Sequence, residues 1–479
     1  MNPSVEPFNK SKYKALMDGL ECNEVSLSEI YNNKDQRIDS AFYTARILRN
    51  PNLTYVPIGQ HLTSTQYGVS KDMNEEYIGY PIYRMNEIHH MLCDLNPAKA
   101  VELSEAEFEK FKLNNGDVLF NRTNSYELVG RTGIYYYNGV DQTYASYLVR
   151  LNPDNDNILS EYLVAFLNSK YGVADIKRRA RQSINQTNVN PEEVKEIQIP
   201  LISKPLQKLI KKCFKSANLL RNSAITEYTV AESIMAQAFD LPKPKENTIL
   251  VSVKSLADSF SITGRLDAEY YQDDFERYNN ALRTTNNISS LCKINDSNFL
   301  PKSDELYTYI ELANVGMIGN ISCGEKQNGS DLPSRARRKV NAGQVIVSSV
   351  EGSLQSCALI TEEYDGAICS TGFFVVESDY INPETLLVLF KSQPIQALMK
   401  QRCSGTILTA ISKDEFLSMP FPEIAVPIQK EIESKVQKSF ALRRKSEKLT
   451  EYAKHAVEIA IEQNESAAFD WLKEKGVEN

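Results

Sequence analysis

The chain is long enough for more than one domain. Its 479 residues exceed what one hydrophobic core usually spans, and a hydrophobic content of 42% with a charged content of 24% excludes wholesale disorder. No apolar run has the length of a membrane span and the first residues lack the apolar core of a signal peptide, so we expect a cytoplasmic protein. The formal net charge of −8 disfavours nucleic acid as a partner without excluding it, because local charge decides such contacts.

Metal and cofactor motifs are absent from the sequence. The eight cysteines form no CxxC pair and the four histidines lack the HExxH spacing of a zinc site. There is also no GxGxxG after a strand, no phosphate-binding loop and no Asn-Pro-Pro-aromatic or Asp-Pro-Pro-aromatic motif of an amino-methyltransferase. We therefore expect a non-catalytic chain that binds no metal or cofactor of its own.

The two halves of the chain share a series of similar segments in the same order. RIDSAFY at 37–43 recurs as RLDAEYY at 265–271, and PLQK at 205–208 recurs as PIQK at 427–430. The separation between matched segments changes little along the chain, as small loop insertions and deletions would produce, so a unit has been duplicated in tandem. Further matches are VSLSEI with VSVKSL, NNGDVLF with NAGQVIV, EYLVAFLNS with ETLLVLFKS, and QTNVNPEEV with LTAISKDEF.

Each copy is predicted to begin with strands and to continue with a helix. Short apolar runs rich in β-branched residues predict the strands, and a Thr-bearing turn follows the helix. Each unit is therefore α+β and of domain size, roughly 170 to 180 residues. The predicted strands cover 116–123, 130–137 and 144–151 in the first copy and 343–350, 356–363 and 370–377 in the second, and the helices cover 160–180 and 383–401.

A long helix is predicted after each unit. Steps of four and three residues from Leu206 to Ala238 meet an apolar residue at nine of ten positions, which is typical of a coiled-coil seam. The same steps in the second copy run from Ile428 to Ala460 with three polar interruptions, at Lys435, Ser439 and Ser446. Antiparallel pairing would bury both seams, and helices of this length reach roughly 50 Å. The segment LPKPKEN at 241–247 is expected to end the first helix as a stiff linker.

This ordered pair of copies resembles the specificity subunit of type I restriction-modification systems. The likeness covers about residues 25–463, and in the second copy Gly343-Gln344 replaces the usual glycine-aspartate pair. The residues that carry it are Gly116 to Leu119, Asn121 to Thr123, the segment NQTNVNPEEVKEIQIP with Pro205 and Gln207, then Gly343, Thr409 to Glu415, Pro422, Pro427 and Gln429, together with RLDAEYY.

The resemblance implies two tandem target recognition domains, each followed by a long helix, with the helices paired as an antiparallel coiled coil of pseudo-two-fold symmetry. It implies that each domain reads one half of a bipartite site in double-stranded DNA, and that the helices set the gap and dock two methyltransferase subunits. Restriction or translocase subunits are further candidate partners, whereas a membrane is not. The expected boundaries are 1–205 for the first domain, 206–242 for the first helix and linker, 243–426 for the second domain, 427–464 for the second helix and 465–479 for a C-terminal tail.

The family also implies where the chemistry of the complex resides. The assembly methylates adenine and can cut unmethylated DNA, while the specificity subunit itself is not an enzyme. S-adenosylmethionine, ATP and magnesium are expected on the partner subunits.

Polar residues after the predicted strands are candidates for base contacts. Arg122, Thr123, Asn124 and Ser125 follow a strand of the first copy, where a loop can present groups that hydrogen-bond base edges. A plain surface turn is the alternative interpretation. The counterparts in the second copy include Ser349 and Glu351, and the Glu351 carboxylate could accept from a cytosine amino group.

Basic residues are candidates for phosphate contacts. Lys177 and Arg179 match Lys400 and Arg402 at the same place in the repeat, and this recurrence favours phosphate contact over simple solvation. Arg335, Arg337 and Arg338 belong to the run RARRK at 335–339, which has no counterpart in the first copy, where the run is EKFKL, so they would make phosphate contacts specific to the second domain.

Two other functions stay open at this point. A scaffold that does not bind DNA could use the coiled coil to bridge two protein partners, and alanine at the recurring basic residues would then leave DNA association unchanged. The same fold could instead belong to a related assembly without a translocase, which only the co-purifying subunits would distinguish.

Overall fold

The computed structural model divides the chain into two compact units. Unit 1 comprises Met1–Leu220 with Lys445–Asn479, and unit 2 comprises Arg221–Arg444. The predicted linker at 241–247 lies outside the described residues. Those residues are 9–20, 22–33, 36–45, 47–184, 186–239, 253–257, 259–260, 264–282, 284–322, 326–405 and 409–477.

Unit 1 is built on a six-stranded sheet with smaller sheets beside it. The six strands have the order β2-β11-β7-β9-β5-β4, and the smaller sheets have the orders β10-β3-β6, β12-β13-β8 and β1-β14. The strands are β1 (Tyr55–Pro57), β2 (Leu62–Tyr67), β3 (Tyr80–Tyr83), β4 (Ile88–His89), β5 (Leu92–Cys93), β6 (Lys99–Val101), β7 (Val118–Asn121), β8 (Thr123–Asn124), β9 (Thr132–Ile134), β10 (Thr143–Tyr144), β11 (Leu148–Pro153), β12 (Arg181–Gln182), β13 (Thr187–Asn188) and β14 (Gln198–Pro200).

Helices cover the sheet of unit 1, and every residue of α5 is buried. The predicted C-terminal tail contains α16, whose Ala468 and Leu472 belong to the same hydrophobic core as α5. The helices are α1 (Lys10–Met17), α2 (Leu27–Asn32), α3 (Ser40–Thr44), η1 (Ile58–His61), α4 (Glu105–Phe111), α5 (Ser160–Leu167), α6 (Lys170–Arg179), α7 (Pro191–Lys195) and α16 (Glu465–Glu474).

Unit 2 repeats the central strands of unit 1. Its sheets have the orders β15-β22-β19-β20 and β17-β16-β21-β18, so β19 lies between β22 and β20 as β7 lies between β11 and β9. The elements are η2 (Ala268–Tyr271), α10 (Asp273–Leu282), α11 (Ile288–Leu291), β15 (Lys293–Ile294), β16 (Leu306–Ile310), η3 (Leu312–Asn314), β17 (Lys326–Asn328), β18 (Ala336–Lys339), β19 (Val345–Ser348), η4 (Glu351–Ser353), β20 (Cys357–Leu359), η5 (Glu362–Tyr364), β21 (Ile368–Ser370), β22 (Phe373–Glu377), α12 (Pro383–Lys391), α13 (Gln393–Gln401) and α14 (Lys413–Ser418).

The prediction of one helix after the strands of each copy was wrong, because two short helices occupy each segment. Ser169 is extended and caps α6 by accepting a hydrogen bond from the Gly172 amide, and Ser392 is extended between α12 and α13. In unit 2, Pro394 is the second residue of α13, a position that tolerates proline, whereas the interior of one long helix would not. Apolar periodicity continues through both breaks and therefore did not reveal them.

We expect Gly172→Ala to destabilise unit 1 by roughly 2–4 kcal/mol. A Cβ atom at Gly172 would lie 2.2 Å from the Phe166 carbonyl oxygen and 2.7 Å from the Leu167 Cα, and backbone atoms cannot move aside as a flexible side chain can. Chemical denaturation checks this, with Gly352→Ala as the control because no atom lies within 4 Å of a Cβ built there. Equal effects of the two substitutions would contradict the explanation.

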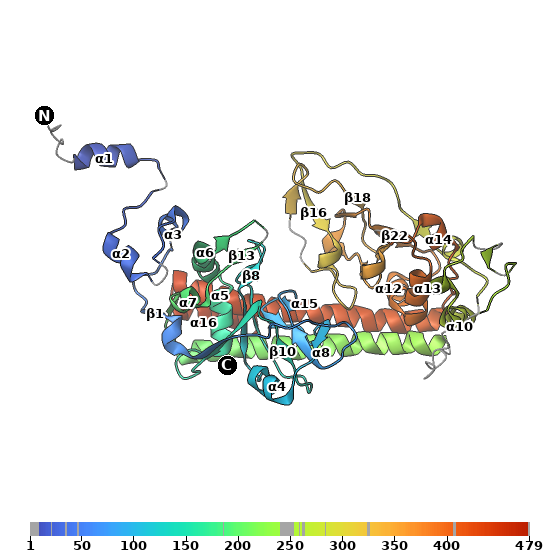
Figure 1. Cartoon of the computed structure of the whole chain (residues 1–479), viewed down its shortest axis with the longest axis horizontal. Helices are drawn as coiled ribbons and strands as arrows, with labels where there is room; N and C mark the ends of the chain where they lie inside the picture. The colour runs from blue at the N-terminus through green and yellow to red at the C-terminus, as the bar shows by residue number, and fades with distance from the viewer. Residues whose placement is uncertain are drawn as a thin grey trace. The chain divides into compact units, whose positions relative to one another are not determined.

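The two long helices, α8 (Lys204–Ala238) and α15 (Val426–Glu462), are continuous, as predicted (Figure 1). Within unit 1, the first half of α8 and the last half of α15 share one core. Within unit 2, the last half of α8 and the first half of α15 share another. The contributing residues are Ile210, Cys213 and Ala217 with Ala453, Ala456 and Ala460 in unit 1, and Tyr228, Ala231 and Met235 with Ile432, Val436 and Phe440 in unit 2.

The three polar residues of the predicted seam make contacts between the helices. Within unit 1, the Ser446 hydroxyl donates to the Ala217 carbonyl at 2.7 Å. In unit 2, the Ser439 hydroxyl donates to the Ala224 carbonyl at 2.6 Å, and Lys435 lies 3.1 Å from the Glu227 carboxylate. Each polar group is therefore satisfied, and the small serines let the helices approach closely.

Near the end of α8 the predicted seam is wrong by about one position. Ala238 is exposed, while Tyr228, Ala231, Met235 and Phe239 are buried. A helix with 3.6 residues per turn drifts away from a strict heptad, and this end of α8 also packs against the globular core of unit 2.

Gln207 and Gln429, the glutamines of the recurring segments PLQK and PIQK, have a structural role. Gln207 is 1% exposed; its Oε1 accepts from the Leu159 amide at 2.9 Å and its Nε2 donates to the Asn157 carbonyl at 2.9 Å. In unit 2, the Gln429 Oε1 accepts from the Asn382 amide at 2.8 Å. Each glutamine therefore fixes the start of the helix that follows the strands, α5 or α12, against the long helix.

Candidate nucleic-acid interface

The predicted base contacts of the first copy lie at the end of the central strand. Thr123 and Asn124 form β8, which pairs with β13, and β13 pairs in turn with β12. The Thr123 hydroxyl is buried and donates to the Asn188 side-chain oxygen at 2.6 Å. Asn124 is half-buried and Ser125 is exposed. This short sheet thus presents polar side chains from segments that are far apart in the sequence.

Arg122 is placed by an aromatic side chain. Its guanidinium carbon lies 5.0 Å from the centre of the Tyr67 ring, and Tyr67 is 47% exposed. The buried Arg122 Nε makes no hydrogen bond with a described residue. A stacked arginine of this kind holds its planar donors in a fixed direction, which suits contact with a guanine edge or a phosphate.

Lys177 holds the loop that follows β8. Its ammonium donates to the carbonyls of Tyr126, Glu127 and Val129, with distances of 3.1 Å to the last two, and lies 4.9 Å from the Tyr126 ring centre. Burial lowers the pKa of Lys177. Because an ammonium has three donors, these carbonyls occupy its capacity in this conformation. Lys177 therefore lies beside the predicted base contacts and shapes their loop.

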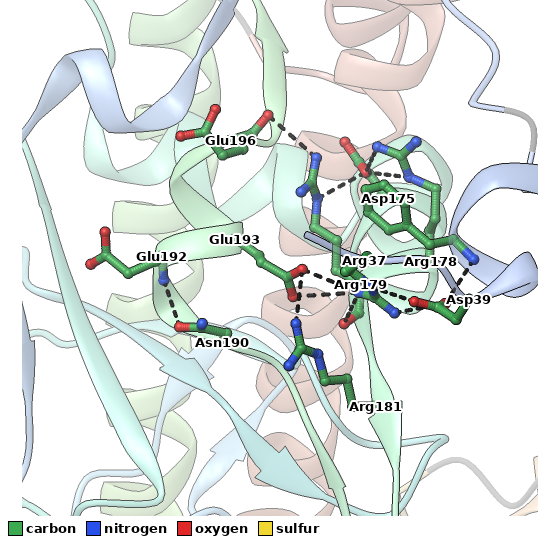
Figure 2. Close-up of polar contacts among 11 residues, drawn as sticks. Arg37, Asp39, Asp175, Arg178, Arg179, Arg181, Asn190, Glu192, Glu193 and Glu196 are labelled. Atoms are coloured by element: carbon green, nitrogen blue, oxygen red, sulfur yellow. Dashed lines mark hydrogen bonds and ion pairs between the residues drawn. The ribbon is translucent and has the colours of Figure 1, made fainter. Parts of the chain in front are cut away.

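Arg179 lies inside a buried ion-pair network (Figure 2). It is 5% exposed, and its Nε donates to Asp175, which is 2% exposed, at 3.1 Å. Burial lowers the pKa of the Arg179 guanidinium. A phosphate contact by Arg179 would require this pair to open, so the side chain positions the end of α6, from which β12 begins.

In the recurring RIDSAFY segment, Arg37 contacts Asp39, the end of α6 and Glu193 of α7, and we call this set of contacts the arginine clasp. The Arg37 guanidinium pairs with Asp39 at 2.7 Å, donates to the Arg179 carbonyl at 3.0 Å and reaches the buried Glu193 carboxylate at 3.2 Å. Figure 2 shows these groups meeting between α6 and α7. The clasp thus joins the segment before β1 to the two helices on either side of the β12–β13 hairpin.

Unit 2 contains a related clasp, in which the matching glutamate lies beside Arg402. Arg265 pairs with Asp267 at 2.6 Å and donates to the Cys403 carbonyl at 3.3 Å, at the end of α13. Arg402 lies 3.9 Å from Glu415, which matches Glu193 in the repeat. Its guanidinium also donates to the Leu398 carbonyl at 3.2 Å. Arg179 and Arg402, which recur at the same place in the repeat, therefore both make contacts at the end of a helix, α6 or α13.

The clasps are expected to weaken in acid. The hydrogen bond from Arg37 lowers the pKa of Asp39 below 3.8, and the hydrogen bond from Arg265 lowers that of Asp267 likewise. A lowered folded-state pKa means that the carboxylate stabilises the fold fully above about pH 4 and loses this effect as the pH falls through its folded-state pKa. Asp39→Asn should therefore destabilise the protein at neutral pH and progressively less below about pH 4, as urea unfolding at several pH values would show. A constant difference across that range would contradict the assignment.

The second copy brings two of its predicted contacts to one groove. Glu351 and Lys400 both line a groove of about 1120 Å³ in unit 2, together with Arg265, Tyr278 and Glu415. Lys400 is exposed. Ser349 lies at the end of β19, where its hydroxyl donates to the Gly372 carbonyl at 2.9 Å.

The basic run of the second copy lies on β18. Arg335 is exposed, whereas Arg337 and Arg338 are half-buried. The Arg337 Nε donates to the Ser334 carbonyl at 2.9 Å, and the buried Arg338 Nη1 makes no hydrogen bond with a described residue. Of these three arginines, Arg335 is thus the most accessible to a phosphate.

The β12–β13 hairpin was not predicted from the sequence. Arg181 and Gln182 are exposed, and the Arg181 guanidinium, 49% exposed, lies 3.5 Å from Glu193. Asn188 of β13 pairs with Thr123 of β8. The match between QTNVNPEEV and LTAISKDEF marked this segment as repeated, but it gave no sign that the hairpin pairs with β8.

Over the part of the chain that the structure describes, no group of three or more His, Cys, Asp or Glu side chains could hold a metal ion. No helix among the described residues has the length and apolar character needed to cross a membrane.

Comparison with known proteins agrees with the resemblance seen in the sequence. Residues 64–234 match the model of the type I restriction modification DNA specificity domain. A Methanocaldococcus jannaschii protein named as the MjaX type I restriction enzyme specificity subunit is 30% identical over 146 residues, covering 30% of this chain and 34% of that protein. The type I restriction enzyme EcoKI specificity subunit of Escherichia coli K12 is 27% identical over 188 residues, covering 37% of this chain and 40% of that protein.

Among solved structures, the HsdS subunit from Thermoanaerobacter tengcongensis aligns with 87% of this chain and 98% of its own length at 13% identity, with a TM-score of 0.29. That score is too low to establish a shared fold. The sequence matches to the relatives span about a third to two fifths of their lengths. The predicted resemblance to type I specificity subunits is confirmed, and it is residues 64–234 that match the specificity-domain model.

Proposed function

We propose that the chain is the non-catalytic DNA specificity subunit of a type I restriction-modification complex. The observation that carries this proposal is a repeated arrangement. In both units a polar segment after the central strand pairs with the segment that follows the Lys-x-Arg helix, at Thr123 with Asn188 and at Val350 with Ala410. One scaffold that presents different side chains twice suits a protein that reads two different half-sites.

The two domains and their helices follow from the same proposal. We place the domain boundaries at 1–205 and 243–426, and the helices with their adjoining linker at 206–242 and 427–464. The pairing of Ala217 with Ser446 supports an antiparallel coiled coil, as does that of Ala224 with Ser439. Because the repeat relates 217 to 439 and 224 to 446, one contact is the counterpart of the other, as pseudo-two-fold symmetry requires.

Partners and cofactors are assigned by the same reasoning. The subunit binds double-stranded DNA in the cytoplasm and docks two methyltransferase subunits, with restriction subunits as further partners. S-adenosylmethionine, ATP and magnesium belong to those partners. No observation favours a scaffold that does not bind DNA.

DNA binding by the purified complex with its methyltransferase subunits tests the proposal. The target motif is the sequence at which cells expressing the complex methylate their DNA. We expect tight binding to duplexes that contain this motif and much weaker binding to scrambled duplexes, measured by fluorescence anisotropy. Equal affinity for both, or none for either, would contradict a specificity role.

Two exposed cations should contribute to binding through phosphates. We expect Arg335→Ala and Lys400→Ala each to make the negative slope of log affinity against log salt shallower by about 1, with little change in sequence preference. Exposed residues are suited to this test because alanine at the buried Arg179 would also disturb the fold. As a control, Lys302→Ala removes an exposed lysine that pairs with Glu305 and should leave the slope unchanged. The hypothesis of phosphate contact fails if Arg335→Ala and Lys400→Ala behave like this control.

A further inference from the structure

The short β12-β13-β8 sheet of unit 1 places two side-chain amides on one face. Gln182 pairs with Thr187, and Thr187 pairs with Asn124 on its other side. Residues directly opposite one another on neighbouring strands project from the same face. Gln182 and Asn124 therefore flank Thr187 at a separation of two strand spacings, about 10 Å.

Both amides are available to a ligand. Gln182 is exposed and Asn124 is half-buried, whereas Thr187 between them is 4% exposed. The Asn124 Oδ1 accepts from the Ser125 amide at 2.8 Å, which orients the side chain. Among the described residues, none forms a hydrogen bond with the Gln182 side chain or with the Asn124 Nδ2.

Ion pairs and hydrogen bonds support the short sheet at both of its edges. Arg179 and Asp175 form a buried pair where α6 leads into β12, and Arg181 lies beside Glu193 of α7. Lys177 binds the carbonyls of the loop after β8. These contacts fix both edges of the sheet, and such support gives a recognition site its precise geometry.

Unit 2 keeps the same backbone arrangement with different side chains. Ser404 pairs with Ala410, and Ala410 pairs with Val350, as isolated bridges. These bridges place Glu351 at the position of Asn124 and Gly405 at the position of Gln182, so neither amide is kept in unit 2. A purely structural sheet would have no need of amides in one unit only, so the difference points to what each unit contacts.

We propose that Gln182 reads the adenine of an A·T base pair in the half-site bound by unit 1, and that Asn124 contacts a second base of the same half-site. The side-chain amide of a glutamine or asparagine complements adenine, because its oxygen accepts from the N6 amino group while its nitrogen donates to N7. A two-stranded β-ribbon such as the β12–β13 pair fits the major groove, where A·T is distinguishable from the other base pairs. This inference rests on the proposed function.

Methylation sequencing of cells that express the subunit with its methyltransferase tests the inference. In Gln182→Ala we expect one A·T position of one half-site to become degenerate, with discrimination reduced by about tenfold or more, while the other half-site and the gap stay unchanged. In Gln182→Glu the same position should shift towards C·G, because a carboxylate accepts from the cytosine amino group. Gln60→Ala, at an exposed glutamine of η1, is the matched control and should leave the motif intact.

The possible results distinguish a failure of the role of Gln182 from a failure of the proposed function. If wild type yields no bipartite motif, the proposed function itself fails. An unchanged motif in both Gln182 variants, with a normal bipartite motif in wild type, would overturn only the role of Gln182. Equal loss in both half-sites, or total loss of methylation by variants whose thermal unfolding matches wild type, would also overturn it, because the residue would then serve binding or assembly and not base choice.

Discussion

Replacing Asp175 with alanine is expected to lower the free energy of unfolding by about 3–5 kcal/mol, because it leaves a buried arginine without its counter-ion. Asp175 is 2% exposed and contacts both Arg178, at 2.9 Å, and Arg179, at 3.1 Å. Of the two arginines, Arg179 is itself buried, at 5% exposure, so its guanidinium would be left without water or a counter-ion. Guanidinium chloride unfolding, followed by circular dichroism, measures the loss.

An exposed pair of the same geometry provides the control. Asp274 and Arg277 also lie three residues apart on a helix and approach to 2.8 Å, but the Asp274 side chain is 46% exposed. Asp274→Ala should therefore cost no more than about 0.5 kcal/mol. Should Asp175→Ala prove equally mild, the network would not be a buried support, and its role beneath the β12–β13 hairpin would have to be abandoned.

The second large effect is expected in the seam between the long helices. Leucine at Ser446 would place a branched side chain against Ala217, where the serine hydroxyl now donates to the backbone, and leucine at Ser439 would do the same against Ala224. Both serines are buried, at 3% and 0% exposure. Overpacking of this kind costs about 1–3 kcal/mol at each site, so the double variant should lose about 2–6 kcal/mol.

Comparison with milder changes distinguishes overpacking from the lost hydrogen bonds. The alanine variants at Ser439 and Ser446 should each lose only about 1 kcal/mol, because the site stays small. Lys445→Leu, at an exposed position of α15, should be nearly neutral. Thermal unfolding of this series would contradict close helix packing if leucine and alanine had equal effects at the serine positions.

Features with a sequence period were predictable. The strands β7 and β19, the long helices and the duplicated plan follow from alternating or heptad patterns and from matched segments such as PLQK and PIQK. The local break between α5 and α6 was not predictable, since Asn168 and Ser169 interrupt the helix without interrupting the apolar pattern.

The candidate site was less predictable because ion pairs and short sheets join distant residues. Lys177 and Arg179 recur in the repeat, yet the sequence cannot tell that Arg179 faces Asp175 or that Lys177 binds the loop after β8. Arg37 lies 156 residues from Glu193, which it contacts. Gln182 carried no signal of its own, since only the pairing of β12 with β13 and β8 aligns it with Asn124.

Methylation sequencing of wild type tests the central claim most directly. The chain would be expressed with the proposed methyltransferase partner in cells without other adenine methylation, and every methylated site would be mapped. A duplicated pair of recognition units predicts methylated adenines within a single motif made of two defined halves and a gap of fixed length. Methylation without such a motif, or with one continuous motif, would contradict the account.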